Sequence, residues 1–301
     1  MMQDSETPAD KKLQHLVPMG LHLVATPIGR ARDITLHALD VLRQADVLVA
    51  EDTRVLRKLL TLHGIAVGDR TLIAHHDHSK QRGFSTIEAA LLNGKIVAYA
   101  SDAGTPMVSD PGLRLVTLAH ELGAAVHAAP GPSSILTALV LSGLPTDRFF
   151  FGGFLPVKAA ARQKRLEEVS TIEATVVLFD TPKRFLSGLN AMADLLGSER
   201  DIAICRELTK RHEQVVRGQM GDVLDHLVRD PDYVPEKGEL VIVIGPPKLR
   251  ALSDADIEEM LTEVLEVHGV NGAAAHVAGA LGVKKSRVYS LALKMKRRSD
   301  M

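Results

Sequence analysis

The sequence contains no tryptophan, a single cysteine and no apolar run long enough to cross a membrane. The lone Cys205 excludes an intrachain disulfide framework and is typical of a protein kept in a reducing compartment. The longest apolar stretch, residues 135–141, is far shorter than the roughly 20 residues of a transmembrane helix. Residues 1–20 are polar and lack the basic start and apolar middle of a signal peptide. We therefore expect a cytoplasmic protein with a flexible N-terminal tail and no membrane partner.

Neither sign of charge dominates, because 36 basic residues nearly balance 37 acidic ones and the formal net charge is −1. This sum excludes a uniformly basic protein that coats nucleic acid, but it leaves local basic patches open. Hydrophobic residues make up 46% of the 301 residues, far more than a disordered chain carries. The length predicts about two globular domains, at roughly 150 residues each.

The first half of the chain alternates short aliphatic segments with stretches of helical periodicity. The expected strands are residues 21–26, 47–50, 72–74, 96–100 and 125–129. Helices are expected over 34–44 with Asp33 as N-cap, over 113–122 with Asp110 as N-cap, and over 135–142. Strands that alternate with helices of about ten residues predict βαβ units and a mostly parallel sheet. Ligands bind such sheets at the carboxyl ends of the strands, so we expect the functional residues in the loops that follow the strands.

The Gly-, Pro- and Phe-rich segment 144–156 interrupts this alternation and is the expected domain junction. Beyond it, strands are expected over 175–179, 202–205, 214–216 and 239–244, and helices over 159–169, 184–196 and 222–228. A Gly-Pro-Pro linker then precedes two helical stretches, 254–268 and 272–296. We therefore predict an α/β protein made of a tail (1–20), two α/β domains (21–146 and 147–247) and a small helical C-terminal module (248–301).

The sequence lacks a G-x-x-x-x-G-K-[ST] loop, and no G-x-G-x-x-G follows the first strand. Three other rigid loops follow strands instead. Residues 26–30 (TPIGR) follow the first strand, and residues 101–112 (SDAGTPMVSDPG) combine Asp, Gly and Pro in a way that core packing does not need. Residues 130–134 (PGPSS) open a helix whose first N–H groups can face a polar ligand. Three such loops at one sheet edge predict a ligand site, with Asp102 placed to hold a hydroxyl or an amine.

These loops carry a family resemblance. The segments TPIGRARDIT, AEDTR, SDAGTPMVSDPG, PGPSS and KGELVIVIGP resemble the tetrapyrrole-methylase superfamily. Two segments, AEDTR (50–54) and the His-rich segment 74–79, resemble most the sequences of one branch of this superfamily. That branch methylates the ribose 2′-hydroxyl of a cytidine in 16S ribosomal RNA. The similarity runs from about residue 21 to 247 and continues less distinctively to the C-terminus. It implies two α/β domains with S-adenosylmethionine in the cleft between them, the small-subunit rRNA or the assembled small ribosomal subunit as substrate, and a homodimer.

The resemblance also implies which residues line the cofactor site. In the first domain they are Pro27, Ile28, Asp102, Ala103, Gly104, Thr105, Ser133 and Ser134. In the second domain they are Phe179, Glu207, Gly238 and Glu239, together with neighbours at 180–182, 206 and 237. Asp180 departs from the family pattern, which has a glutamate there, and the shorter side chain leaves a direct contact by this carboxylate open.

Methyl transfer needs an in-line nucleophile at about 3 Å from the methyl carbon, and a ribose hydroxyl is a weak nucleophile that a base or cation would help. Glu51, Asp52 and Arg54 follow the second strand and are therefore the predicted catalytic residues. We expect Arg54 to orient a phosphate while one of the two carboxylates accepts the hydroxyl proton. The alternative is that this charged segment only begins the helix that follows it.

The segment AHHDHS (74–79) contains three imidazoles and a carboxylate, which are good zinc ligands. No second, well-separated ligand set is evident, so we expect no metal site. We instead expect His75 and His76, with Arg30, to contact RNA by stacking or by bonds to phosphate. A solvated loop is the alternative. Cys205 is expected to be a small buried hydrophobe.

The C-terminal module is the most basic part of the chain. Apolar residues at helical spacing, a break at 281–283 and a basic helix after it predict a helix-turn-helix. No acidic residue occurs among residues 282–299. The side chains expected to bind RNA phosphates are Lys284, Lys285, Arg287, Lys294 and Lys296, with Arg297 and Arg298 beyond them. A charged face that is merely solvated is the alternative.

Two other functions remain open at this point. A methylase of precorrin-like small molecules would share the cofactor loops but would have no use for a basic terminal module. A DNA-binding helix-turn-helix regulator would use the two α/β domains as a ligand sensor and would have no methylase activity.

Overall fold

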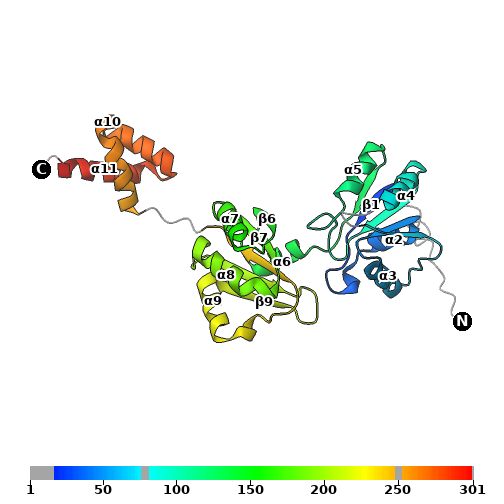
Figure 1. Ribbon diagram of the computed structural model, residues 1–301. Coiled ribbons are helices and arrows are strands. Elements are labelled where there is room, and N and C mark those ends of the chain that lie inside the picture. Colours follow the sequence, from blue (N-terminus) through cyan, green and yellow to red (C-terminus); the bar gives the residue numbers. More distant parts are fainter. Residues whose placement is uncertain (1–16, 76–80, 248–252, 300–301) are drawn as a thin grey trace. The chain divides into compact units, whose positions relative to one another are not determined.

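The computed structural model describes residues 17–75, 81–247 and 253–299. The chain divides into two compact units, residues 1–247 and residues 248–301. The first unit contains two sheets of five strands each, and the second is helical (Figure 1). The α/β fold class with a helical C-terminal module is therefore confirmed. Among the described residues, no helix combines the length and the apolar character that crossing a bilayer requires.

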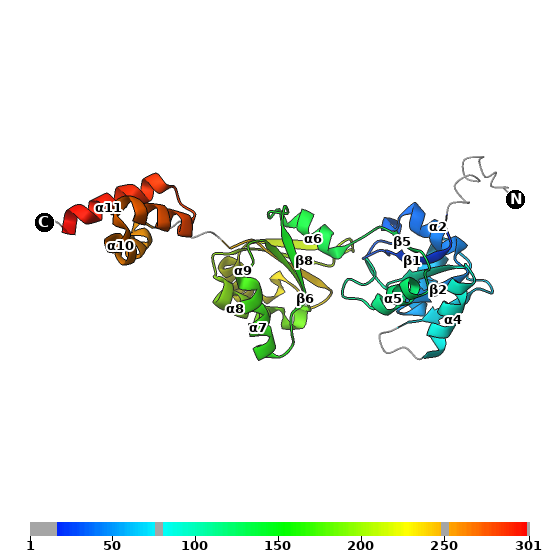
Figure 2. The same cartoon turned by 90° about the horizontal axis from the view of Figure 1, so that it is seen from above.

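The first sheet is parallel throughout, with strand order β3-β2-β4-β1-β5. Its strands are β1 (Gly20–Val24), β2 (Val47–Ala50), β3 (Thr71–Ala74), β4 (Ile96–Ala100) and β5 (Val126–Ala129). Between them lie η1 (Ala31–Asp33), α2 (Leu36–Gln44), α3 (Thr53–Leu62), α4 (Gln81–Leu92) and α5 (Leu113–Glu121). Helices α2 and α3 pack on one face, and α4 and α5 pack on the other (Figures 1 and 2). This layering buries the central strands and leaves the loops at their carboxyl ends available for function.

Two helices of this sheet have N-caps other than those predicted, and the first of them also begins later. Helix α2 begins at Leu36, because the hydroxyl of Thr35 accepts the N–H of Ala38 at 3.2 Å, whereas Asp33 lies in η1. Helix α5 begins at Leu113 with Gly112 as its N-cap at φ 137°. A Cβ at Gly112 would lie 2.7 Å from the Tyr99 ring, so the helix starts at this close approach and Asp110 does not cap it.

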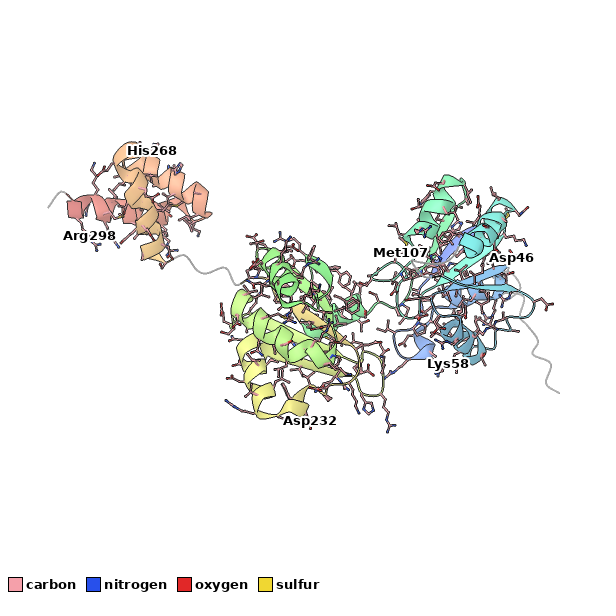
Figure 3. All side chains as sticks on the ribbon, in the orientation of Figure 1. Asp46, Lys58, Met107, Asp232, His268 and Arg298 are labelled. Atoms are coloured by element: carbon pink, nitrogen blue, oxygen red, sulfur yellow. The ribbon has the colours of Figure 1, made fainter. Side chains whose placement is uncertain are left out.

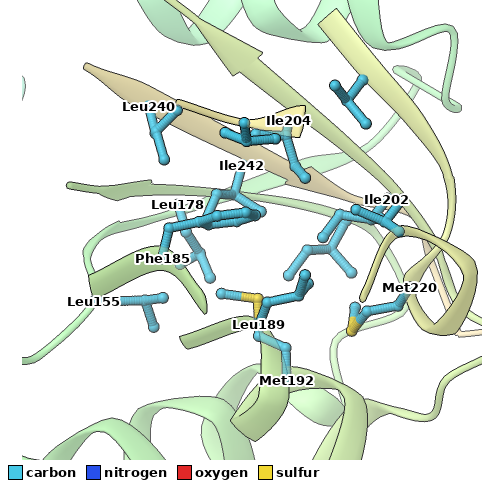
Figure 4. Packing of buried hydrophobic residues seen from close by; sticks show 14 of the residues in the cluster. Leu155, Leu178, Phe185, Leu189, Met192, Ile202, Ile204, Met220, Leu240 and Ile242 are labelled. Atoms are coloured by element: carbon cyan, nitrogen blue, oxygen red, sulfur yellow. The ribbon is translucent and has the colours of Figure 1, made fainter. Parts of the chain in front are cut away.

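The second sheet has the order β6-β7-β10-β8-β9, in which only β6 and β7 pair in parallel. Its strands are β6 (Phe149–Phe154), β7 (Thr175–Asp180), β8 (Asp201–Arg206), β9 (Gln214–Gln219) and β10 (Leu240–Ile244). The helices are α7 (Ala159–Ser170), α8 (Pro182–Leu196) and α9 (Met220–Arg229), followed by η2 (Pro231–Tyr233). On one face of the sheet, Leu189 and Met192 of α8 pack against Ile242 of the central strand (Figure 4). Burying each such leucine stabilises the fold by about 1.5–3 kcal/mol.

Strand β6 lies in the segment that the sequence assigns to a domain junction. The register shifts between Phe151 and Phe154, and Gly153 adopts φ 69°. A Cβ at Gly152 would lie 2.6 Å from the side chain of Leu178. In the sequence these two glycines indicate a turn. In the structure Gly153 permits the β-bulge, and Gly152 permits the close approach of β6 to Leu178 of β7.

Helix α6 (Ser134–Ser142) follows the first sheet in the chain but packs on the second. Its Ile135, Ala138 and Leu139 join a buried cluster with side chains of β7, β8 and β10. Cys205 of β8 is buried in that cluster, as predicted, and burial raises the pKa of its thiol to about 12. A domain boundary at residue 146 would therefore separate α6 from the sheet that it covers.

The helical unit consists of α10 (Asp254–Leu281), which kinks at Gly269, and α11 (Lys285–Ser299). Ser253 and Asp256 form a capping box at the start of α10, and Gly282 ends it in the left-handed conformation. The apolar faces of the two helices pack together. The predicted break at 281–283 is therefore confirmed, while the predicted gap before residue 272 is a kink.

His22 of β1 is fully buried and stacks on His127 of β5, with ring centroids 4.7 Å apart. Its Nε2 shares a hydrogen bond of 2.7 Å with the carbonyl oxygen of Pro18. Burial lowers the pKa of His22 below 6.5, and the positive charge that His127 and His37 can carry lowers it further, although the Pro18 carbonyl opposes the shift. The folded protein therefore holds His22 as a neutral imidazole.

We predict that the free energy of unfolding falls as the pH drops through 6.5, because His22 then gains a proton in the unfolded chain but not in the folded one. The loss continues until the pH reaches the lowered pKa of the folded state. His22→Phe should show a flatter pH dependence in urea unfolding between about pH 7.5 and 5. His120→Gln, which changes an exposed imidazole on α5, is the control, and equal slopes in wild type and His22→Phe would contradict the prediction.

Candidate functional site

The loop of residues 101–112, which follows β4, is held at both ends. Thr26 and Gly104 form an isolated antiparallel bridge, with N···O distances of 2.9 and 3.0 Å. At the other end, the Tyr99 hydroxyl donates a hydrogen bond of 2.7 Å to the carbonyl of Pro111. The loop is thereby tied to β4 and to the segment that follows β1.

Between these ties the backbone is strained. Met107, labelled in Figure 3, and Ser109 adopt φ 70° and φ 65°, values that side chains with a Cβ disfavour. Each such residue costs about 1–3 kcal/mol and persists only where the surrounding structure imposes it. The imposed shape places Val108, Ser109 and Asp110 in the wall of a cavity.

This cavity has a volume of about 380 Å³ and lies where the loop, the start of α6 and the second sheet meet. Its volume falls in the range of roughly 300–1,000 Å³ that is usual for small-molecule sites. The wall consists of Ala103, Gly104, Thr105, Val108, Ser109, Asp110, Ser133, Ser134, Ile135, Phe154, Phe179, Asp180, Thr181, Gly238, Glu239, Leu240 and Val241.

Eight of the predicted cofactor residues line this cavity. They are Ala103, Gly104, Thr105, Ser133, Ser134, Phe179, Gly238 and Glu239. Asp180 and Thr181, which the sequence indicates as neighbours, also line it. The sequence does not reveal the contributions of Val108, Ser109, Asp110, Ile135, Phe154, Leu240 and Val241. Asp110 could have been predicted as a site residue, because it is the second acidic residue of the SDAGTPMVSDPG motif. The aliphatic residues could not, because they resemble ordinary core positions.

The other four predicted cofactor residues do not line the cavity. Pro27 is half-buried, and Ile28 is buried in the apolar cluster around α6, where it packs with Leu208. Asp102 instead accepts the backbone N–H of Asp52 at 2.9 Å. Of these residues, Ile28 lies next to the wall, because a Cβ at the wall residue Gly104 would be 3.4 Å from its Cγ2.

Glu207, the fourth, holds Glu239 in position. Its Oε1 accepts a hydrogen bond of 2.9 Å from Lys210 Nζ and one of 3.0 Å from the N–H of Glu239. Burial opposes the ionisation of Glu207, but these two bonds outweigh it and lower the pKa of the carboxyl. Lys210 also bonds the Glu239 carboxylate at 3.0 Å, so one cation ties both acids together.

The first turn of α6 presents polar groups to the cavity. Ser133 is the N-cap, and its hydroxyl accepts the N–H of Leu136 at 3.4 Å. Ser134 is the first residue of the helix. Thr105 donates a hydrogen bond of 3.2 Å to the carbonyl of Pro132, which connects this turn to the loop after β4. The partial positive charge of a helix N-terminus suits an anionic group.

An aromatic surface forms another part of the wall. Phe179 contacts Phe151 and Phe154 edge to face, with centroids 4.9 and 5.2 Å apart. Phe154 is 55% exposed although it lies on β6. Flat apolar rings that line a cavity can stack on a planar ligand group.

Asp180, where the family pattern differs, does line the cavity. Its Oδ1 accepts the N–H of Thr181 at 2.8 Å and a hydrogen bond of 2.9 Å from Arg184 Nη2. Burial nonetheless raises the pKa of this carboxyl, because the favourable contacts compensate only part of the lost hydration.

The three predicted catalytic residues do not line the cavity. Asp52 is the N-cap of α3, and the Arg54 guanidinium grips its carboxylate at 2.6 Å through Nη2 and at 3.0 Å through Nε. The bonds from the Arg54 side chain and backbone lower the pKa of Asp52 to about 2. A carboxylate of such low basicity is a weak proton acceptor. Glu51, the residue before it, is half-buried.

The pKa of Asp110 is shifted in the opposite direction from that of Asp52. Burial raises the pKa of its half-exposed carboxyl to about 6, and the negative charges of Glu51 and Asp102 contribute to the rise. A perturbed acid in a cavity wall is a typical mark of a functional group.

The predicted RNA-contacting residues are distributed unevenly. Arg30 is exposed, with its backbone N–H bonded to the Thr209 hydroxyl at 3.2 Å. His75 is only 1% exposed and packs edge-on to Phe84 and Tyr99, so its ring has no surface from which to contact RNA. His76 lies outside the described residues. Within the described ranges, no group of three or more His, Cys, Asp or Glu side chains could hold a metal ion.

The predicted basic residues of the helical unit all lie on its surface. They are Lys284, Lys285, Arg287, Lys294 and Lys296. Arg287 forms an ion pair of 2.7 Å with Asp254, which connects the start of α11 to the start of α10. Both partners are about half exposed, so this pair contributes little to stability.

Comparisons with known proteins agree with the geometry. The family model of tetrapyrrole (corrin/porphyrin) methylases matches residues 20–224, and the model described as the RsmI C-terminal HTH domain matches residues 251–296. The ribosomal RNA small subunit methyltransferase I of Mesorhizobium japonicum is 44% identical over 276 residues, which is 92% of each chain. The protein of the same name from Erythrobacter litoralis is 43% identical over 287 residues, 95% of this chain and 99% of its own.

Among solved structures, the cobalamin-biosynthetic enzyme cobalt precorrin-4 methyltransferase matches 76% of this chain and 98% of its own, with a TM-score of 0.52 at 19% identity. That likeness shows the shared fold alone. The two family models and the relatives along nearly the whole length confirm the resemblance found in the loops. The chain belongs to the tetrapyrrole methylase family and, within it, to the ribosomal RNA small subunit methyltransferase I group.

Proposed function

We propose that this chain transfers a methyl group from S-adenosylmethionine to the ribose 2′-hydroxyl of a cytidine in 16S ribosomal RNA of the small ribosomal subunit. The observation that carries the proposal is the cavity of about 380 Å³ between the loop after β4, the start of α6 and the second sheet. The relatives named ribosomal RNA small subunit methyltransferase I support the choice of substrate. A homodimer stays a prediction.

The cavity wall fits the chemical groups of S-adenosylmethionine. Phe154 and Phe179 offer flat apolar surface for the adenine. Ser133 and Ser134 at the α6 N-terminus suit the carboxylate of the methionine part. Carboxylates in the wall suit its positively charged amine and sulfur. When bound, this cofactor supplies an electrophilic methyl group.

The chain itself supplies position and exclusion of water. The ties of the loop at Thr26 and Tyr99 fix the wall before any ligand enters, which reduces the reorganisation that binding requires. An in-line approach to the methyl carbon at about 3 Å then depends on how the RNA is held. We infer that exposed basic residues hold the RNA. These residues are Arg30, in the loop that follows β1, and the basic side chains of α11 in the helical unit.

Two observations weigh against the alternatives. A methylase of precorrin-like small molecules would not need a helical unit whose α11 carries three arginines together with Lys294 and Lys296. A DNA-binding regulator would not be expected to share 44% and 43% identity over nearly the whole chain with relatives named ribosomal RNA small subunit methyltransferase I. We therefore favour methyl transfer to RNA.

We predict that small subunits from cells lacking this enzyme gain a methyl group when incubated with the protein and radiolabelled S-adenosylmethionine. Nuclease mapping should place the label on the ribose of one cytidine. Naked 16S RNA, a tetrapyrrole and subunits from wild-type cells are the comparison substrates. Label on a base, or transfer to the tetrapyrrole in place of RNA, would contradict the proposal.

We predict that Gly238→Ala weakens cofactor binding about tenfold or more, as measured by calorimetry with S-adenosylhomocysteine. Gly238 has φ 101°, and a Cβ there would lie 2.6 Å from the Glu207 carboxylate that positions Glu239. Gly68→Ala is the matched control, because Gly68 also has positive φ (58°) but meets nothing within 4 Å. The control should lose some stability and keep its affinity. Equal affinities of both variants would show that Gly238 is not needed for binding.

We predict that replacing Lys294 and Lys296 together by alanine weakens RNA binding and makes the slope of log affinity against log salt shallower by about one per lost phosphate contact. Both side chains are exposed on α11. Lys95→Ala is the control, because this exposed residue precedes β4 and lies at the opposite sheet edge from the loops. An unchanged salt slope in the double variant would mean that α11 does not contact the RNA backbone.

A further inference from the structure

Asp110 occupies a distinctive place in the cavity wall. It follows Ser109, whose backbone is strained at φ 65°, and precedes Pro111, whose carbonyl is bonded by the Tyr99 hydroxyl. The residue is therefore fixed between an imposed turn and a tie to β4. Its carboxyl is partly buried and lines the same cavity as the hydroxyl groups at the start of α6.

The other carboxylates near the cavity are engaged by donors. Asp180 accepts hydrogen bonds from Thr181 and Arg184, and Glu239 bonds to Lys210. Farther back, Asp102 accepts the N–H of Asp52, whose own carboxylate is gripped by Arg54. These donors therefore already occupy part of the acceptor capacity of each carboxylate, although burial still raises the pKa of Asp180.

We propose that Asp110 is the general base of the methyl transfer and accepts the proton of the RNA ribose hydroxyl. This assignment rests on the proposed function. The hydroxyl oxygen forms a bond to the methyl carbon while the bond between that carbon and the cofactor sulfur breaks, and its electron pair stays on sulfur. The O–H bond of the ribose breaks at the same stage, and its proton moves to the Asp110 carboxylate. The products are a methyl ether, a neutral thioether and a protonated Asp110.

The charges around Asp110 suit this role. Glu51, just before α3, and Asp102, in the same loop, are the negative groups that act on it. Arg54 balances Asp52 and acts on Asp102 rather than on Asp110. Across the cavity, Asp180 and Glu239 are paired with Arg184 and Lys210. With a pKa of about 6, Asp110 is ionised at neutral pH yet remains basic enough to accept a proton in the transition state.

The test is Asp110→Asn in the full-length chain. We expect kcat for methylation of small subunits to fall by about 10²–10⁴-fold, while the KM for subunits and the Kd for S-adenosylhomocysteine stay within about twofold. The wild-type kcat should fall tenfold per pH unit below about pH 6, and the residual activity of the variant should not show this ionisation. A residue that only supports the fold would not remove one limb of the pH profile.

Two readouts need no activity. Carbon-13 NMR of the Asp carboxyl groups in the unliganded chain should show one group that titrates near pH 6 and is missing in Asp110→Asn. The variant should also unfold at a higher temperature at neutral pH. The raised pKa means that the ionised carboxyl destabilises the folded state at every pH above its unfolded pKa of 3.8, so its removal is stabilising there.

Asp40→Asn is the matched control, because this carboxyl on α2 pairs with Arg43 and lies outside the cavity wall. Asp52→Asn tests the rival base and should keep the ionisation near pH 6. An Asp110→Asn enzyme with wild-type kcat and pH profile would overturn the assignment while leaving the proposed function intact. Weaker cofactor binding with unchanged kcat would also overturn it, since Asp110 would then be a cofactor contact. A wild-type chain that methylates no RNA would overturn the proposed function, and the base with it.

Discussion

The packing of α6 on the second sheet is the constraint on which the site depends. The chain leaves β5 of the first sheet, turns at Pro130–Ser133, and then buries Ile135, Ala138 and Leu139 among strands of the second sheet. The first turn of α6 is thus held against the second sheet by its own apolar side, while the chain before it remains hydrogen-bonded within the first sheet. Ser133 caps α6 and Ser134 is its first residue, so the start of the helix brings both to the cavity. The cavity therefore depends on α6, which follows the first sheet in the chain but packs on the second sheet. The parts of the wall that come from the two sheets are for this reason not independent of each other.

Around this helix the protein accepts several locally unfavourable features. Met107 and Ser109 have strained backbones, Gly238 is confined by Glu207, and Asp110 lies near two other acids. The strained backbones of Met107 and Ser109 each reduce stability by about 1–3 kcal/mol, and the burial of the charged Asp110 carboxylate reduces it further. The large apolar clusters of both sheets offset them. Unfavourable features that gather around one cavity are what a site under functional constraint shows, because sites of this kind trade stability for preorganisation.

The sequence predicts the parts of the site that depend on local composition. Loops rich in Gly, Pro, Asp and Ser at the ends of strands are recognisable, because no core position needs such residues, and they supply most of the polar wall. The sequence fails where long-range contacts decide. Asp110-Pro111 matches the pattern of an N-cap and first helical residue, but the contact of Gly112 with Tyr99 moves the helix start and leaves Asp110 to the cavity. Leu240 and Val241 line the wall with the same aliphatic chemistry that fills the core, so composition cannot distinguish them.

The net charge of −1 is likewise a poor guide to the partner, because acidic and basic residues are concentrated in different helices. In the helical unit, Asp254 and Asp256 lie in the first turn of α10, where a carboxylate is stabilised by the helix dipole. Lys296, Arg297 and Arg298 lie in the last turn of α11, where a cation is stabilised in the same way. These acids and bases thus each stabilise their own helix, and the ion pair between Arg287 and Asp254 is exposed and weak. Lys296, Arg297 and Arg298 are exposed, so an RNA phosphate can approach them even though acidic and basic charges nearly cancel in the sum over the chain.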